Sequence, residues 1–323
     1  MMRGLAAPIA RRAVIVAWLC GLGALTTFAP YLPEPLAPAT LRWLAGLASH
    51  WQWAYAGFAL FSAALVIGLR REHRWPLLVP LALVAAAWLH QAPRAETFTP
   101  TTAAQSQFTV ASANLNFERT DHSALTAWLL SANAPDVIAL QEFTPSALAM
   151  TNSPAILAAY PHRVLAPSDD QFGLGVLSKA PITAVEKVEP ADMLATLKLR
   201  LRVNVQGHLI ALTAIHPMPP INAAYAQARD ASLRLEAQQL ARTGMPGILL
   251  GDMKDTPWST GLQAAAPLQR ASSLAPTWPN VGGWLSVLPL DHVLVTPGVR
   301  VGDAGLGVEV GSDHRGVWVR LAL

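Results

Sequence analysis

Residues 247–259 read GILLGDMKDTPWS, a short apolar run that ends at Gly251 and is followed at once by the acidic Asp252. An apolar run of this length between turn residues is typical of a buried β-strand. A purely structural chain has little reason to place a carboxylate directly at the end of such a strand. The stretch therefore predicts a buried strand whose end carries a functional side chain.

Polar side chains stand in the same place beside other apolar runs. They are Asn114 and Asn116 after FTVASA, Glu142 after DVIALQ, His216 after LIALTAI, Asp291 at the start of DHVLV, and Asp313 and His314 before the last strand. Each of them alone is more often a cap or turn residue. Their amide and carboxylate oxygens suit a hard cation such as Mg²⁺ or Mn²⁺, and none of these positions offers a cysteine for zinc.

Short apolar runs alternate with helical segments from Phe108 onward. The expected strands cover residues 108–114, 137–141, 173–177, 194–205, 208–215, 247–250, 290–295 and 316–323, and the expected helices cover 122–132, 145–158 and 221–241. Gln206 and Gly207 separate two strands as a hairpin turn does, which predicts some antiparallel pairing. Many strands and few helices favour a mixed α/β layered sandwich over a purely parallel doubly wound sheet.

The motifs follow one another in a specific order. They are SANLN at 112–116, LQE at 140–142, GLGVLSK at 173–179, HPMP at 216–219, LLGDMKDTPWS at 249–259, LDHVL at 290–294 and GSDHR at 311–315. This series resembles the endonuclease/exonuclease/phosphatase superfamily, which includes pancreatic deoxyribonuclease, abasic-site endonucleases, neutral sphingomyelinases and inositol polyphosphate phosphatases. The resemblance covers residues 107–323 and implies a four-layer sandwich of two mixed β-sheets flanked by helices.

The resemblance also implies a divalent-metal site that uses Mg²⁺ or Mn²⁺. Glu142 is similar to the family's principal metal ligand, with Asn114 beside it. Asp313 would complete or support this metal site.

The same resemblance assigns the catalytic groups. Asp252 would position or deprotonate the attacking water, and His314 would contact the scissile phosphate. Asp291 would hold one imidazole tautomer of His314, while His216 resembles the second histidine of deoxyribonuclease-like members. The candidates for substrate binding are Asn116, Arg315 and Trp284.

Lys254 is the one departure from the family pattern. The usual motif is G-D-x-N, and Lys254 stands where its asparagine belongs. A lysine can still donate to a phosphate oxygen and adds a positive charge, but it has no carbonyl oxygen for a metal. We therefore expect one metal centred on Glu142, with Lys254 as a catalytic residue; the alternative is a binding protein with a decayed site.

The first hundred residues hold the excess of apolar side chains. The whole chain is 52% hydrophobic and only 13% charged. Three apolar stretches, Ala13–Pro33, Trp51–Leu69 and Trp75–Pro93, each approach the roughly 20 residues that span a bilayer as a helix. The sequence thus predicts a three-helix transmembrane anchor over residues 1–93, a linker over 94–106 and a catalytic domain over 107–323. A cleaved signal peptide is less favoured, because no clear cleavage site follows the first stretch.

The charges divide unequally between these regions. Residues 1–105 carry eight arginines against three acids, a balance of +5, and the remainder carries 15 basic and 17 acidic side chains, a balance of −2. The basic pI therefore belongs to the anchor, and nucleic acid is a less favoured partner. The arginine clusters before the first stretch and between the second and third predict a cytoplasmic N-terminus and a periplasmic or extracellular catalytic domain, as a multi-pass protein of the inner (cytoplasmic) membrane.

The motifs leave three functions open. The first is a metal-dependent phosphoesterase that cleaves a phosphodiester or phosphomonoester of a lipid or lipid-linked substrate at the membrane. The second is an extracytoplasmic nuclease, which needs a basic groove that the sequence does not show. The third is the non-catalytic membrane protein with a decayed site. The sequence does not identify protein partners.

Overall fold

The computed structural model describes residues 2–33, 36–69, 74–98, 107–282 and 285–323, with the side chains of residues 2–5 excepted. The chain divides into two compact units. The helical unit comprises residues 1–92, 220–223 and 256–263. The second unit comprises residues 93–219, 224–255 and 264–323 and is called the catalytic unit because the sequence predicts the catalytic residues there.

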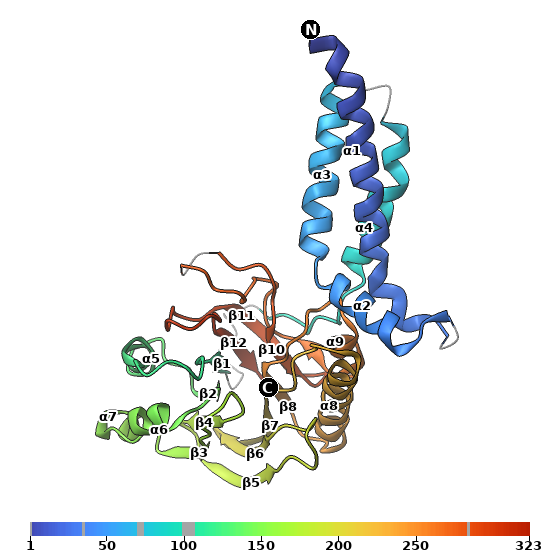
Figure 1. The fold of residues 1–323 in the computed structure, drawn as a ribbon. Coiled ribbons are helices and arrows are strands. Elements are labelled where there is room, and N and C mark those ends of the chain that lie inside the picture. The colour runs from blue at the N-terminus through green and yellow to red at the C-terminus, as the bar shows by residue number, and fades with distance from the viewer. Residues whose placement is uncertain (1, 34–35, 70–73, 99–106, 283–284) are drawn as a thin grey trace. The chain divides into compact units, whose positions relative to one another are not determined.

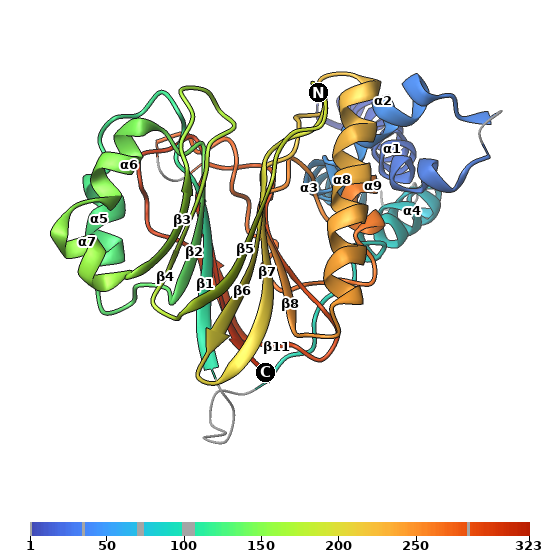
Figure 2. The same ribbon diagram turned by 90° about the horizontal axis from the view of Figure 1, so that it is seen from below.

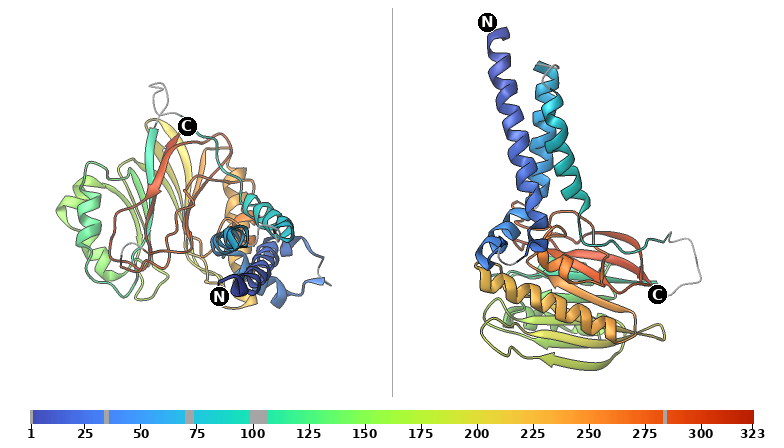
Figure 3. Two further views of the ribbon diagram at one scale, coloured as in Figure 1. Left: turned by 90° about the horizontal axis from the view of Figure 1, so that it is seen from above. Right: turned by 90° about the vertical axis from the view of Figure 1, so that its right-hand side faces the viewer.

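The helical unit contains two long apolar helices, a shorter third apolar helix and several short pieces. Its elements are α1 (Met2–Ala24), η1 (Leu25–Tyr31), α2 (Ala39–Ser49), α3 (Gln52–Leu69), η4 (Trp75–Leu77), α4 (Leu78–Leu89) and most of α9 (Thr260–Ala264). Helices α1, α3 and α4 lie side by side (Figures 1 and 3). Two helical stretches, Ala6–Tyr31 and Gln52–Leu69, are long and apolar enough to cross a bilayer, whereas the expected third span is a shorter apolar helix, Trp75–Leu89.

Small side chains hold these helices together. The inward stripe of α1 consists of Ala10, Ala13, Ala17, Cys20 and Ala24, all buried. They recur every three or four residues, which is the spacing of one helix face. Large apolar side chains such as Leu60, Phe61 and Leu89 point outward instead, with exposed fractions of 64%, 67% and 78%. Among the described residues, this is the reverse of a water-soluble bundle, in which large apolar residues face inward.

Trp258 is the centre of an aromatic cluster within the helical unit. Its ring centroid lies 4.9 Å from that of Trp88, which lies 4.5 Å from that of Trp53. The Trp258 Nε1 donates to the Trp88 carbonyl at 3.1 Å, and the Thr27 hydroxyl donates to the Trp258 carbonyl. The segment that begins at Thr256 is therefore tied to α3 and α4 through one fully buried indole, and to η1 through the carbonyl of the same residue.

Replacement of Trp258 by alanine should destabilise the helical unit. Removing a fully buried indole leaves a cavity, at a cost of about 3–5 kcal/mol. Thermal melting of the full chain in detergent measures the effect. The control is Trp75→Ala, since Trp75 is 63% exposed; equal melting temperatures of the two variants would contradict the packing described.

The catalytic unit is built on two six-stranded sheets (Figure 2). The first has the order β11-β12-β1-β2-β4-β3 and the second β5-β6-β7-β8-β10-β9. Their strands are β1 (Gln107–Asn114), β2 (Val137–Gln141), β3 (His162–Ala166), β4 (Leu174–Ser178), β5 (Ile182–Val188), β6 (Lys198–Val205), β7 (His208–Ile215), β8 (Gly247–Asp252), β9 (Gln269–Arg270), β10 (Asp291–Val295), β11 (Arg300–Leu306) and β12 (Val317–Ala322). The pairs β1–β2 and β7–β8 are parallel and the others are antiparallel, so both sheets are mixed.

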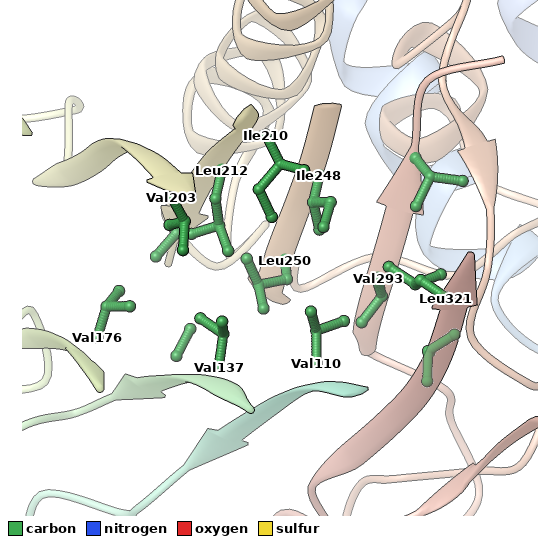
Figure 4. Packing of buried hydrophobic residues seen from close by; sticks show 14 of the residues in the cluster. Val110, Val137, Val176, Val203, Ile210, Leu212, Ile248, Leu250, Val293 and Leu321 are labelled. Atoms are coloured by element: carbon green, nitrogen blue, oxygen red, sulfur yellow. The ribbon is translucent and has the colours of Figure 1, made fainter. Parts of the chain in front are cut away.

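Helices cover the outer faces of the two sheets. Helices α5 (Ser123–Leu129), α6 (Pro145–Thr151) and α7 (Pro154–Ala159) lie outside the first sheet, and α8 (Ala223–Arg242) lies outside the second (Figure 2). The inner faces pack on one another through side chains that alternate along the strands, such as Ile248 and Leu250 of β8 (Figure 4). This arrangement confirms the expectation of two mixed sheets flanked by helices.

Most of the expected strands and helices match the structure to within a few residues. The largest strand error is at residues 194–197, where the Leu194 and Ala195 amides donate to the Asp192 carboxylate in a turn, so that β6 begins only at Lys198. The expected helix 145–158 is two helices, because Pro154 cannot continue the first one. Gln206 and Gly207 form the expected hairpin turn, with φ values of 52° and 91°.

Sequence periodicity did not reveal β3, β5, β9, β11 or α2. Strand β5 lies at a sheet edge with five of its seven residues exposed, so its sequence has no buried face. Strand β11 contains two glycines, which weaken any strand pattern. Within the expected linker, Arg94 and Thr97 form bridges with Arg270 and Val301, and residues 99–106 lie outside the described part of the chain.

Candidate active site

The topology brings the polar strand ends together at one edge of the catalytic unit. Strands β1 and β2 run parallel with Asn114 opposite Gln141, so that Glu142 follows directly beside Asn114. Strands β8 and β10 run antiparallel with Asp252 opposite Asp291. His216 follows β7, the parallel neighbour of β8.

Asp252 lies at the centre of the site. Its Oδ2 is 2.6 Å from Lys254 Nζ, 3.4 Å from His314 Nε2 and 3.5 Å from His216 Nε2. The side-chain Nδ2 of Asn114 donates to the same oxygen at 3.1 Å. The carboxylate is fully buried. Four polar groups from four separate parts of the sequence thus converge on one oxygen atom.

His314 is oriented by a buried carboxylate. Its Nδ1 lies 2.9 Å from Asp291 Oδ2, which leaves Nε2 directed toward Asp252. The hydroxyl of Thr277 accepts from the Asp291 amide and fixes the start of β10. The expected pairing of Asp291 with His314 is therefore present in the geometry.

Glu142 is held beside Asn114. The Asn114 Nδ2 donates to Glu142 Oε1 at 2.9 Å, and the Phe117 amide donates to Oε2 at 2.8 Å. His216 Nε2 is 4.0 Å from Glu142 Oε1. Asp313 contacts a different residue: Asn116 Nδ2 donates to Asp313 Oδ1 at 3.1 Å.

Three site residues have unusual backbone conformations. Asn116, Glu142 and Lys254 have φ values of 58°, 55° and 52°, a region that non-glycine residues rarely adopt. Gly251, which precedes Asp252, has φ of 153°, and a Cβ there would lie 1.9 Å from the Ile215 carbonyl oxygen. Such strain often accompanies functional sites, where the surrounding structure fixes it.

Positive charges keep Asp252 ionised. Burial by itself raises the pKa of this carboxyl, but Lys254, His314 and His216 outweigh it and lower the pKa well below the ordinary value. Burial lowers the pKa of Lys254, yet Asp252 more than compensates and raises it. Asp252 and Lys254 therefore form a buried ion pair.

His314 is a cation at neutral pH. Burial lowers its pKa, but Asp252 and Asp291 raise it to about 9. The pKa of Asp291 is raised by burial, although His314 opposes this. A protonated Nε2 can donate a hydrogen bond to an anionic substrate.

Activity should fall as the pH rises through about 9, the pKa to which His314 is raised from 6.5. His314 is protonated below this pH and loses its donor proton above it. The stability that His314 contributes is likewise complete below 6.5 and lost as pH rises through about 9. The pH profile of kcat/KM measures the alkaline limb. Asp291→Asn should shift this limb to lower pH; an unshifted limb in that variant would contradict the role of the pair.

The donor set fits a divalent cation. Asp252, Asp291 and His314 each present a ligand atom within 4.8 Å of the others. His216 Nε2 and Asp291 Oδ1 are buried without a hydrogen-bond partner in the described part of the chain. Glu142 and Asn114 add further oxygens, and such oxygen-rich sites suit Mg²⁺ or Mn²⁺.

The structure brings most of the expected site residues together, and three candidates remain apart from that group or undescribed. Asp313 contacts Asn116 and Trp278 rather than Glu142. Arg315 follows His314, and its Nε is buried without a hydrogen-bond partner among the described residues. Trp284, expected to bind substrate, lies outside the described residues.

Sequence reasoning missed two residues near the site, because neither follows the end of an expected strand. The Trp278 Nε1 donates to Asp313 Oδ2 at 3.3 Å, and its ring centroid lies 6.4 Å from that of His314. Arg229 in α8 donates to the Lys254 carbonyl at 2.8 Å. The sequence predicts only a helix over residues 221–241, and the one signal there is a pair of charged residues, Arg229 and Asp230, in an Ala-rich stretch.

Comparisons with known proteins agree with this geometry. The model of the Endonuclease/Exonuclease/phosphatase family matches residues 111–314. A humanized D. rerio TDP2 is 18% identical, with a TM-score of 0.56 over 67% of this chain and 99% of that one. An endonuclease/exonuclease/phosphatase from Beutenbergia cavernae is 22% identical, with a TM-score of 0.55 over 68% and 72%.

A mannosyl-6-phosphatase from Bacteroides thetaiotaomicron is 19% identical, with a TM-score of 0.51 over 67% of this chain and 100% of that one. A comparison with the sequences of curated proteins gave no match. At these identities the structural likenesses show a shared fold.

Proposed function

Because the chain belongs to the Endonuclease/Exonuclease/phosphatase family, we propose that it is a membrane-anchored, divalent-metal-dependent phosphoesterase that acts on a lipid or lipid-linked phosphate. Members of this family hydrolyse phosphate esters. The observation that carries the proposal is the convergence of Asn114, His216, Lys254 and His314 on the Asp252 carboxylate. A decayed site would have little reason to keep these buried charges paired and aligned.

Hydrolysis of a phosphate ester needs three things, and the site offers a group for each. Charge on the non-bridging oxygens must be neutralised, which protonated His314 and Lys254 can do by donating hydrogen bonds. The attacking water must be oriented, and the ionised Asp252 can accept its hydrogen bond. The departing oxygen needs a proton, which protonated His314 can supply from its Nε2.

Glu142 and Asn114 would hold the cation, with the buried Asp252 beside them. When bound, Mg²⁺ or Mn²⁺ would neutralise phosphate charge as a Lewis acid. Removal of the metal by EDTA should therefore abolish turnover, and an excess of Mg²⁺ or Mn²⁺ should restore it. Product release from bis(4-nitrophenyl) phosphate and from 4-nitrophenyl phosphate checks this, and turnover that is unaltered by EDTA would contradict it.

The helical unit supports the membrane part of the proposal. Its large apolar side chains face outward and its small ones face inward, an arrangement suited to lipid, where close packing of small residues drives helix association. Two of its helical stretches have the length and apolar character of a span. The shorter third helix, Trp75–Leu89, would cross with help from its flanking residues.

The arginine clusters support an extracytoplasmic catalytic unit. Arg11 and Arg12 lie in the N-terminal half of α1, and Arg74 precedes η4. Positive residues of this kind tend to stay in the cytoplasm, so an odd number of spans would place the catalytic unit in the periplasm or outside the cell. A reporter fused after Leu323 tests this orientation. Reporter activity confined to the cytoplasm would overturn it.

The substrate class is tested by comparing turnover of lipid phosphates with turnover of nucleic acid. A catalytic domain tethered to a bilayer meets head groups at high effective concentration. The net charge of −2 after residue 105 also disfavours tight binding to nucleic acid. The full chain with Mg²⁺ or Mn²⁺ should therefore turn over phospholipid or polyprenyl phosphate vesicles faster than plasmid DNA; plasmid nicking that is lost in Glu142→Ala would favour a nuclease instead.

A further inference from the structure

Arg229 is a buried cation of the catalytic unit to which the proposed chemistry gives no role. It lies on α8 and its side chain is only 2% exposed. A buried guanidinium is costly unless several partners surround it. The partners of Arg229 therefore indicate which part of the unit it holds in place.

The partners of Arg229 lie on its own helix and on the loop that follows β8. Its Nη2 is 2.8 Å from Asp230 Oδ1, the helix neighbour. Its Nη1 is 3.1 Å from Asp255 Oδ1 and donates to the Lys254 carbonyl at 2.8 Å. The loop is thus bound at two successive residues by one guanidinium.

This contact acts on a strained residue. Lys254 has φ of 52°, and its amide donates to Asp252 Oδ1 at 3.0 Å. The left-handed conformation is unfavourable for lysine and needs support from its surroundings. Arg229 supports it from the carbonyl side, and His292 Nε2, 3.0 Å from the Asp255 carbonyl oxygen, holds the next peptide from β10.

We propose that Arg229 is a positioning residue that fixes the backbone of Lys254, so that the lysine Nζ meets Asp252. The inference rests on the proposed function for its kinetic consequence, since Lys254 is a catalytic residue there. It depends on the geometry of an arginine. Its Nε and Nη2 hold Asp230 while its Nη1 reaches Asp255 and the Lys254 carbonyl, which the single ammonium group of a lysine does less well.

A double-mutant cycle tests this coupling in the full-length protein. Arg229→Met should lower kcat about tenfold while Lys254 is present, and should lower it less than about twofold in a Lys254→Met background. Arg229→Lys keeps the charge and should lose several-fold, which provides a second variant if Arg229→Met does not fold. Equal losses in both backgrounds would overturn the proposal, because Arg229 would then act independently of Lys254.

Arg200→Met is the matched control. Arg200 also forms an ion pair with α8, at 2.8 Å from the buried Glu236, although its own side chain is 22% exposed; it lies on β6 and its ion pairs are with Glu186 and Glu236. Arg200→Met should lower the melting temperature and leave kcat within about twofold of wild type. A tenfold loss of kcat in this control would show that any disruption of α8 suffices, and would overturn the specific role of Arg229.

Hydrogen exchange separates failure of this inference from failure of the proposed function. The Lys254 amide, bonded to Asp252, should exchange at least about tenfold faster in Arg229→Met or Arg229→Lys than in Arg200→Met. This readout needs no substrate. Unchanged exchange would overturn the positioning role, whereas faster exchange in an enzyme that turns over no substrate would support it and count against the phosphoesterase proposal alone.

Discussion

Asp252→Asn should lower kcat for phosphate-ester hydrolysis by about a thousandfold. The asparagine keeps the size of the side chain but removes the charge that Lys254, His314 and His216 surround within 3.5 Å. It also replaces the anionic acceptor for the attacking water with a neutral one that cannot take up a proton, and losses of about this size follow removal of a central electrostatic or acid–base group. Initial rates with bis(4-nitrophenyl) phosphate at saturating Mn²⁺ measure the effect.

Asp303→Asn is the control for this substitution. Asp303 is a mostly exposed carboxylate that pairs with Arg320 at 3.2 Å on β11 and β12, away from the site. Its replacement should leave the rate unaltered. A loss of less than tenfold in Asp252→Asn, with the folded protein intact, would refute a central role for Asp252.

Lys254→Met should lower kcat by about a hundredfold. Methionine fills much of the same space but leaves the buried Asp252 without the ammonium that lies 2.6 Å away. It also removes a donor for the phosphate oxygens, and loss of one such donor costs about a hundredfold or more. The same initial-rate assay measures this loss.

Lys254→Asn is the informative companion variant. It restores the residue that the family motif usually carries, and should retain more activity than Lys254→Met. Lys179→Met is the control, since Lys179 Nζ donates to the Ala134 carbonyl and lies 3.7 Å from Asp136, remote from the site. If Lys254→Met keeps full activity, Lys254 marks a tolerated change and not a catalytic group.

The fold was predictable wherever strands are buried on both faces. Strand β8 is the clearest case, because GILLG allows little besides a central strand and all six residues of β8 are buried. Edge strands were not predictable. Strand β5, with the sequence ITAVEKV, is mostly exposed, and its conformation depends on pairing with β6 rather than on its own pattern.

The candidate site was predictable as a set of residues but not as a geometry. Asp252, Asp291 and His314 were expected to act together, and they do lie together. Their pKa shifts could not be read from the sequence, because they depend on burial and on which charges the fold brings near. Lys254 shows this best: its identity is plain from the sequence, but its 2.6 Å contact with Asp252 depends on a left-handed backbone.

The N-terminal region shows the opposite limitation. Hydropathy located the apolar segments, but it did not show that Thr256–Gln263 packs with them in the same unit. Nor did it give the length of the third helix, which ends at Leu89 rather than at Pro93. Hydropathy and periodicity along the sequence do not show contacts between segments that are distant in sequence.

Metal-dependent turnover by the full-length protein, compared with that of Glu142→Gln, tests the central claim most directly. Both proteins would be purified in detergent, freed of metal, and assayed on bis(4-nitrophenyl) phosphate with and without added Mn²⁺ or Mg²⁺. We expect wild-type hydrolysis that requires the metal, and a loss of about a hundredfold or more in Glu142→Gln. Absence of hydrolysis by the wild-type protein with either metal, or equal rates for the two proteins, would contradict the claim.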